Sequence, residues 1–213
     1  MARTMRPIAL GLVALIVSCA PATQEEGPPD ELGARSRQET LVPPGYGSLR
    51  QEEVAIRIQL PAVLVRAVPL DESITRLLSP DSYRALRDLE RSRRAEIEQL
   101  AWRHRVRNPS LWYISFFGLE PEARFSPMEI VITSAGRDFR PLDVVPLSTG
   151  FGGQRIRQRE VQSAIYLFDD GININLPLTM TVESVQNASW GGILRAVERE
   201  RALVRSRSGQ TEH

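Results

Sequence analysis

Alternation of apolar and polar residues with a period of two is the feature that most limits how this 213-residue chain can fold. The clearest stretch runs from Ile172 to Glu183, where every second side chain is apolar as far as Val182. Shorter candidate strands occupy residues 54–60, 63–68, 128–133, 142–147 and 161–168. Residues 111–119 are apolar on both faces, which predicts a central strand that is covered on each side. Because this period places neighbouring side chains on opposite faces of a strand, the chain is predicted to consist mainly of short β-strands.

Turn residues between these stretches predict how the strands are joined. Asp169-Asp170-Gly171 is typical of a tight hairpin turn, which predicts that 161–168 pairs directly with 172–183. Pro61 separates the first two stretches, so 63–68 either continues the first strand past a bulge or begins a new one. Pro146 and Pro177 lack a backbone N–H and indicate edge strands or bulges.

Two helices are predicted, near residues 80–105 and 189–206. Ser79 followed by Pro80 is a favourable helix start, and Pro109 lies just beyond the end of the first helix. The second helix has apolar residues on one side and alternating arginine and glutamate on the other. The polar residues 207–213 are predicted to form a disordered tail.

These elements predict a single, mainly β domain over residues 51–206. Short strands with frequent turns favour an antiparallel β-sandwich of the immunoglobulin-like kind, with a long inserted helix and a C-terminal helix. The alternative is an α+β fold, in which one curved antiparallel sheet carries both helices on one side. Helices do not alternate with strands one by one, which argues against a doubly wound parallel sheet.

The N-terminus has the pattern of an export signal. Arg3 and Arg6 precede an apolar run, Ile8–Val17, that ends in Ile16-Val17-Ser18-Cys19. A run of ten residues is too short to span a bilayer but has the length of a signal-peptide core. Residues 1–20 resemble the signal peptide and lipobox of bacterial lipoproteins. The resemblance implies that residues 1–18 are removed and that Cys19 receives lipid chains.

A lipidated Cys19 implies that the mature protein is anchored durably to a membrane, because two or more acyl chains bind far more strongly than one. Ala20 after the cysteine favours the outer membrane, with the domain facing the periplasm; the inner membrane and the cell surface are the alternatives. Residues 19–50 are rich in proline, glycine and charge, which predicts a flexible linker. In the alternative, the segment around Tyr46 docks on the domain.

The composition excludes several classes of function. All 27 basic residues are arginine, so a Schiff-base lysine and a Walker A lysine are excluded. Removal of residues 1–18 leaves 25 arginines against 26 acidic residues, and a nucleic-acid partner is therefore not expected. The single cysteine excludes an intramolecular disulfide.

Groups suited to catalysis or metal binding are scarce. The two histidines are His104, near the end of the first helix, and the C-terminal His213. A lipidated Cys19 leaves no thiol, so neither a nucleophile–histidine pair nor a zinc site is expected, and no cofactor is predicted. We expect a protein that is not an enzyme, although a hydrolase that uses only a pair of carboxylates remains open.

Two groups of residues are candidates for binding a partner. Arg155, Arg157 and Arg159 alternate and are predicted to project from one face of a strand, where they could contact an anionic partner. The alternative is a solvated edge strand whose charges prevent aggregation. Phe125 and Phe151 lie in turn-rich segments and are predicted to be exposed aromatic contacts.

The sequence thus predicts a non-enzymatic accessory or structural component of a larger envelope assembly. Its expected partners are the membrane, through the lipid on Cys19, and an envelope protein. The alternative is a binding module for a glycan, a lipid or a peptidoglycan fragment.

Overall fold

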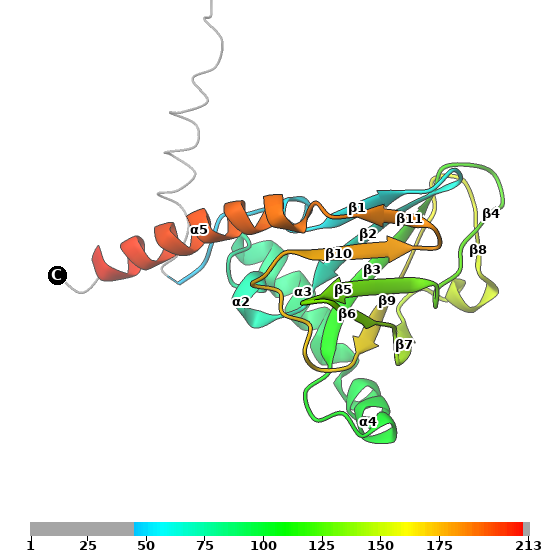
Figure 1. The fold of residues 1–213 in the computed structure, drawn as a ribbon, viewed down its shortest axis with the longest axis horizontal. Helices are drawn as coiled ribbons and strands as arrows, with labels where there is room; N and C mark the ends of the chain where they lie inside the picture. Colours follow the sequence, from blue (N-terminus) through cyan, green and yellow to red (C-terminus); the bar gives the residue numbers. More distant parts are fainter. Residues whose placement is uncertain (1–44, 211–213) are drawn as a thin grey trace, which may run out of the picture.

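Antiparallel strands dominate the computed structural model, which describes residues 45–210 (Figure 1). The expected signal peptide, Cys19 and most of the expected linker lie outside the described residues. The strands are β1 (Ile56–Gln59), β2 (Val63–Pro69), β3 (Ser110–Gly118), β4 (Ala123–Arg124), β5 (Ile130–Ser134), β6 (Arg137–Phe139), β7 (Asp143–Pro146), β8 (Arg155–Ile156), β9 (Val161–Phe168), β10 (Leu178–Val182) and β11 (Val185–Asn187).

Four α-helices occur in the described chain, whereas the sequence predicted two. They are α2 (Glu72–Thr75), α3 (Pro80–Ser92), α4 (Arg94–His104) and α5 (Trp190–Gln210), and two 3-10 turns, η1 (Gln51–Glu53) and η2 (Phe151–Gly153), accompany them. The predicted helix 80–105 is broken because Arg93 leaves the helical conformation, with φ −114° and ψ 7°. Helix α5 extends to Gln210, so the predicted disordered tail is wrong for residues 207–210.

The larger sheet has five strands in the order β1-β2-β3-β9-β7, all paired antiparallel. Strands β1 and β2 form a hairpin across Pro61, so the second apolar stretch is a separate strand. Strand β3 lies in the middle, as the apolar stretch 111–119 predicted, and β7 with Pro146 lies at the edge.

The second sheet has four strands in the order β11-β10-β5-β6, and β4 pairs with β8 in a separate two-stranded ribbon. Ala135 and Gly136 join β5 to β6, and both have positive φ, 50° and 77°. Such a turn matches the twist of a hairpin. The two larger sheets meet where the Asn187 side-chain amide donates a hydrogen bond to the Arg57 carbonyl at 2.8 Å.

The predicted hairpin at Asp169-Asp170-Gly171 is wrong. Strand β9 pairs with β3 and β7, whereas β10 pairs with β5 and β11, so the segment between them crosses from one sheet to the other. The second strand also begins only at Leu178, because Pro177 cannot donate to a ladder and the Asn175 N–H bonds to the Asn173 side chain. The alternation is confirmed within β10 itself.

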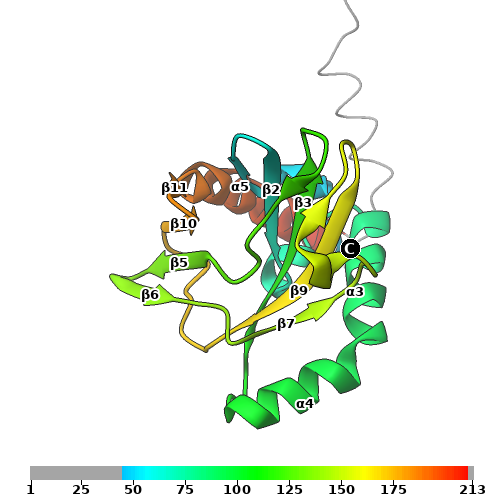
Figure 2. The same ribbon diagram turned by 90° about the vertical axis from the view of Figure 1, so that its right-hand side faces the viewer.

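A single apolar core connects the two larger sheets. Helix α5 closes this core with Trp190, whose ring centroid lies 6.0 Å from that of Trp112 on β3. The buried Trp190 indole N–H donates to the Ile174 carbonyl at 2.8 Å, so the crossing segment is attached to α5. Figure 2 shows α5 beside the sheets and α3 and α4 at the opposite side.

The predicted linker is too long at its C-terminal end, since residues 45–49 belong to the folded domain. The Tyr46 ring packs edge-on against Tyr83, with centroids 5.4 Å apart. A Cβ on Gly47 would lie 1.8 Å from the Leu77 carbonyl oxygen, so only glycine allows this approach. The docking of the Tyr46 segment, the alternative reading of the sequence, is therefore confirmed.

The arrangement confirms a mainly β fold with antiparallel sheets. It comprises three sheets and no closed barrel among the described residues, so the single curved sheet is wrong. The immunoglobulin-like strand order is not confirmed.

Candidate binding sites

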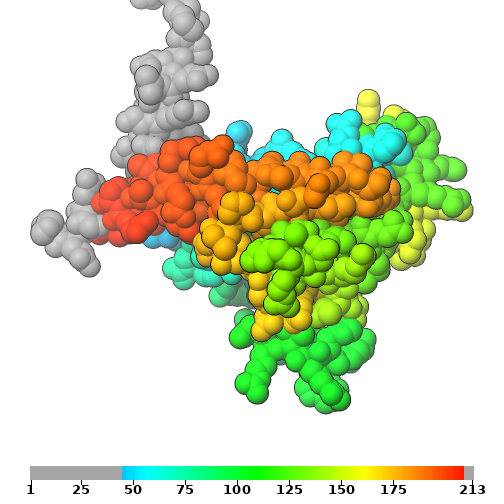
Figure 3. Space-filling view, in the orientation of Figure 1, coloured from blue at the N-terminus to red at the C-terminus, as the bar shows by residue number. Residues whose placement is uncertain are grey.

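The end of α4 carries the most exposed large apolar side chain of the described chain. Trp102 has 83% of its surface accessible, while Ile97 and Leu100 on the same helix are buried. Figures 1 and 3 show α4 projecting from the end of the molecule away from α5. Trp102 was not among the binding residues predicted from the sequence. It lies off the apolar stripe of the predicted helix, however, and such a position indicates an exposed side chain.

Three exposed arginines follow Trp102 in the sequence: Arg103, Arg105 and Arg107. Arg103 lies 3.7 Å from Asp143 on β7, and within residues 45–210 neither Arg105 nor Arg107 forms an ion pair. We name Trp102 and these three arginines the α4 tip. It is a basic surface with an aromatic centre.

His104 attaches the α4 tip to the sheet. Its Nε2 atom lies 3.0 Å from Asp143 Oδ2, a hydrogen bond between α4 and the edge strand β7. The Asp143 backbone is held in β7 by pairing with Leu167, so the end of α4 has a defined position. The structure thus gives His104 a positioning role at a helix end.

The sequence predicted that Arg155, Arg157 and Arg159 project from one face of a strand, but of the three only Arg155 lies in a strand, β8. Arg155 and Arg157 are exposed on either side of the buried Ile156, and Arg157 follows the end of β8. Arg159 follows in a turn with φ 63°, a left-handed conformation that takes it out of the strand.

A cavity of about 500 Å³ lies beside these two arginines. We name it the arginine pocket, and the residues that line it are Glu122, Thr149, Gly150, Gly153, Arg155, Ile156, Arg157, Glu160 and Gln162. The glycine-rich segment 150–153 thus forms one wall. A Cβ on Gly150 would lie 2.8 Å from Gln162 Nε2, so glycine lets the loop approach that amide.

Gln162 is the most unusual residue of the arginine pocket. Only 3% of its surface is accessible, and its Nε2 donates to the Arg155 carbonyl at 2.8 Å and to Glu160 Oε1 at 3.1 Å. These two bonds set the orientation of the amide. Its Oε1 is buried and has no hydrogen-bond partner, an arrangement that costs about 1–3 kcal/mol.

Glu160 supplies a fixed negative charge in the same pocket. The Arg157 backbone N–H and the Gln162 side-chain amide donate to this carboxylate and hold the pKa of Glu160 below its ordinary value. The carboxylate therefore stays ionised at neutral pH. Glu122 also lines the pocket, so the cavity has two acids and two arginines around it.

The predicted exposure of Phe125 and Phe151 is wrong, because each has only 2% of its surface accessible. Phe125 stacks on Phe116 of β3 with centroids 4.4 Å apart, and Phe151 lies 5.4 Å from Phe125. Burial of such large rings is favourable, and it draws both turn-rich segments back onto the sheet. Both phenylalanines therefore belong to the core and are not exposed contacts.

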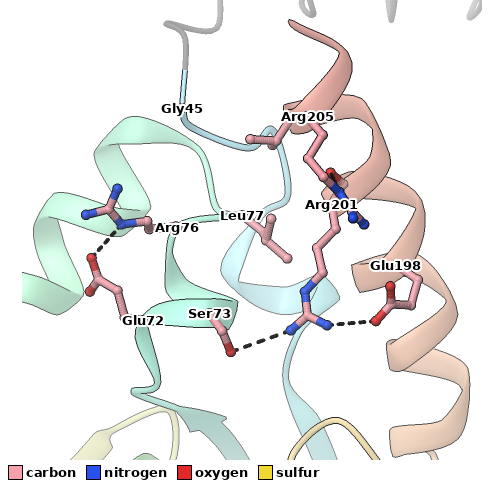
Figure 4. Close-up of a pocket in the computed structure, with 9 residues that line it drawn as sticks. Gly45, Glu72, Ser73, Arg76, Leu77, Glu198, Arg201 and Arg205 are labelled. Atoms are coloured by element: carbon pink, nitrogen blue, oxygen red, sulfur yellow. Dashed lines mark hydrogen bonds and ion pairs between the residues drawn. The ribbon is translucent and has the colours of Figure 1, made fainter. Parts of the chain in front are cut away.

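A second cavity of about 520 Å³ lies between α2 and α5, beside Gly45, the first described residue (Figure 4). Its arginines are largely neutralised by neighbouring acids: Arg76 pairs with Glu72 and Arg201 pairs with Glu198, each at 2.7 Å. This α2–α5 groove therefore has little excess charge with which to select a ligand.

Glu72 connects α2 to α3 at the groove. Partial burial raises its pKa, but hydrogen bonds from Arg76 and Tyr83 and the charge of Arg87 outweigh that effect. The pKa of Glu72 consequently lies below its ordinary value, and the carboxylate joins α2 to α3.

Catalytic and metal-binding groupings are scarce in the part of the chain that the structure describes. No group of three or more histidine, cysteine, aspartate or glutamate side chains there could hold a metal ion. Within residues 45–210, no helix has the length and apolar character needed to cross a bilayer. What the described surface offers is the α4 tip and the arginine pocket.

Because the comparisons with known proteins found no match, the function is inferred from the α4 tip and the arginine pocket. No family model, no curated protein and no solved structure matches this chain.

Proposed function

We propose that this protein is a lipid-anchored, non-enzymatic accessory of a larger envelope assembly, held to the membrane through Cys19. The lipobox pattern of residues 1–20 supports the anchor, and Ala20 favours the outer membrane with the domain in the periplasm. The described residues between the linker and the tail form one domain with a shared core, which suits a tethered binding unit.

The α4 tip is the proposed contact with a partner protein, and the observation that carries the proposal is the exposure of Trp102. Leaving a large indole in water is unfavourable for an isolated domain. Tryptophan and arginine are the residues that most often dominate the energy of protein interfaces. The surplus of arginine favours a partner whose rim is acidic.

For the finer class of the fold, we propose a β-sandwich formed by the five-stranded and four-stranded sheets. The support is the core that the two sheets share, which contains buried residues of both β3 and β10. The alternative function, a module that binds a small or polymeric ligand, is favoured by the arginine pocket.

Replacement of Trp102 by alanine is expected to weaken partner binding by about 2 kcal/mol, roughly thirtyfold in Kd. The assay is cross-linking of tagged protein in intact cells, followed by purification from detergent-solubilised membranes and mass spectrometry. Met128→Ala is the matched control, because Met128 is also an exposed apolar residue and lies outside α4. Equal recovery of a partner with Trp102→Ala and wild type would contradict the proposed contact.

Cys19→Ala is expected to abolish lipidation and processing, so that residues 1–18 stay on the chain. The measurement is the mass of the purified protein together with its distribution between membrane fractions separated by density. Ser18→Ala keeps a small residue before the cysteine and is expected to be processed normally. Wild-type mass and membrane retention of Cys19→Ala would refute the anchor.

A further inference from the structure

We propose that the exposed face of α5 lies against the anionic phospholipids of the membrane to which Cys19 anchors the protein. The inference rests on the proposed lipid anchor and adds how the anchored domain is oriented. Three observations support it: the excess of arginine on α5, the lack of acidic partners for these arginines among the described residues, and the position of Gly45, from which the chain leads back to the anchor.

Helix α5 has a local excess of positive charge. It contains five arginines and two glutamates, whereas residues 19–213 as a whole contain 25 arginines and 26 acidic residues. Both glutamates are already paired. Glu200 is buried and binds Arg207, and the Glu198 carboxylate binds Arg201. The excess charge of the helix is therefore carried by the three other arginines: Arg195, Arg199 and Arg205.

These three arginines are available to an external anion. All three side chains are exposed, and within residues 45–210 none of them forms an ion pair. Arg195 and Arg199 lie one helical turn apart, on the side of α5 opposite the buried Trp190 and Val197. Figure 3 shows α5 at the surface with no other described element in front of it.

An anionic bilayer surface matches the chemistry of this face. Guanidinium groups form paired hydrogen bonds with phosphate oxygens, and the field of many negative headgroups attracts clustered arginines. Leu203 lies one turn after Arg199 and keeps 39% of its surface accessible. Apolar side chains beside basic ones are typical of helices that lie at the boundary between headgroups and acyl chains.

The path of the chain toward Cys19 brings this face near the bilayer. Gly45 lines the same groove as Arg205 (Figure 4), and the Arg207 guanidinium donates to the Tyr46 carbonyl at 3.1 Å. A linker as flexible as the composition of residues 20–44 predicts would span about 25–30 Å on average. A domain of this size is about 40 Å across, so the anchor holds the α5 end nearer to the bilayer than the α4 tip.

The test measures whether the outer face of α5 is shielded from water in the anchored protein. Ala202 is exposed on this face, and Cys19 is the only cysteine, so Ala202→Cys gives a lipidated protein with one free thiol for a nitroxide spin label. The full processed protein is incorporated into vesicles of phosphatidylcholine, with or without phosphatidylglycerol. Electron paramagnetic resonance then measures collisions of the label with an aqueous nickel complex. Ala95→Cys, at an exposed alanine of α4, is the matched control position.

We expect the label at position 202 to be shielded only in the vesicles that contain phosphatidylglycerol, and the label at position 95 to stay open in both. Each arginine near an anionic surface contributes about fivefold, so Arg195→Gln/Arg199→Gln should lower the ratio of docked to undocked domain about twentyfold. High salt should act in the same direction. Arg91→Gln/Arg140→Gln removes two exposed arginines outside α5 and should leave the shielding unchanged.

The outcomes separate this inference from the anchor on which it rests. Protein that floats with neither kind of vesicle would overturn the anchor and the inference together. Protein that floats, but whose label at position 202 is equally open or equally shielded in both, would overturn the inference and leave the anchor in place. Shielding that persists in Arg195→Gln/Arg199→Gln would do the same. A face that binds an acidic protein instead of lipid would give the equally open result.

Discussion

Aspartate in place of Met180 is expected to unfold the domain or to cost about 4 kcal/mol or more of its free energy of unfolding. Met180 is fully buried in the middle of β10, where it pairs with Ile132 on β5. A carboxylate at this position would lose its hydration without gaining a partner, and such a group is among the most costly to bury. The whole stability of a domain is commonly only about 5–15 kcal/mol.

Thr181→Asp is the matched control for this substitution. Thr181 is the next residue of the same strand, but its side chain lies on the opposite face and is half exposed. Its replacement is expected to change the free energy of unfolding by about 1 kcal/mol or less, as is usual for surface positions. Urea titration followed by far-UV circular dichroism compares the two. Similar midpoints for both variants would show that the faces of β10 are assigned wrongly.

Glu200→Ala is expected to lower the free energy of unfolding by about 3 kcal/mol and to detach the segment 45–49 from α5. The Glu200 side chain is only 5% exposed and accepts hydrogen bonds from the Ser48 backbone N–H, the Ser48 hydroxyl and Arg207. Removal of the carboxylate leaves these donors in a partly buried place without their acceptor, which is more costly than the loss of an exposed ion pair.

Glu198→Ala tests whether the loss of stability expected for Glu200→Ala is caused by burial of the Glu200 carboxylate. Glu198 lies on α5 with Glu200 and pairs with Arg201 at 2.7 Å, but 56% of its side chain is exposed. Exposed ion pairs contribute about 1 kcal/mol or less, so this variant should melt close to wild type. Thermal unfolding and the rate of tryptic cleavage after Arg50 measure both effects. If the Glu198 variant lost as much stability as the Glu200 variant, the role given to the buried carboxylate would be wrong.

The local features of the fold could be read from the sequence because each depends on a few neighbouring residues. The period of two identified the buried face of β10, and the stretch 111–119, apolar on both faces, identified β3 as the central strand. Pro80 marked the start of α3, and Pro146 marked an edge strand. These are consequences of backbone geometry and of missing N–H donors.

Strand pairing was harder to predict from the sequence, since it depends on residues that lie far apart in the chain. Asp169-Asp170-Gly171 has the composition of a hairpin turn, yet β9 pairs with β3 and β7 while β10 pairs with β5. The observed pairing places β9 and β10 in two different sheets that share one apolar core. Composition near a turn carries no information about that competition.

The exposure of the candidate binding residues was likewise predictable from the sequence at some positions and not at others. Alternation agrees with the exposure of Arg155 and Arg157 on either side of the buried Ile156. Phe125 and Phe151 were expected to be exposed because they lie among turn residues. Both are buried because the segments fold back on β3.

By itself, the sequence indicated the buried face of β10, the central place of β3, the start of α3 and the edge position of β7. It also carries the lipobox pattern at the N-terminus. Only the tertiary structure decided which strands pair, that Trp102 stays in water and that Gln162 Oε1 lacks a partner in the arginine pocket. The physical reason is that periodicity acts between neighbouring residues. Burial and hydrogen-bond satisfaction depend on what the rest of the chain brings to the same place.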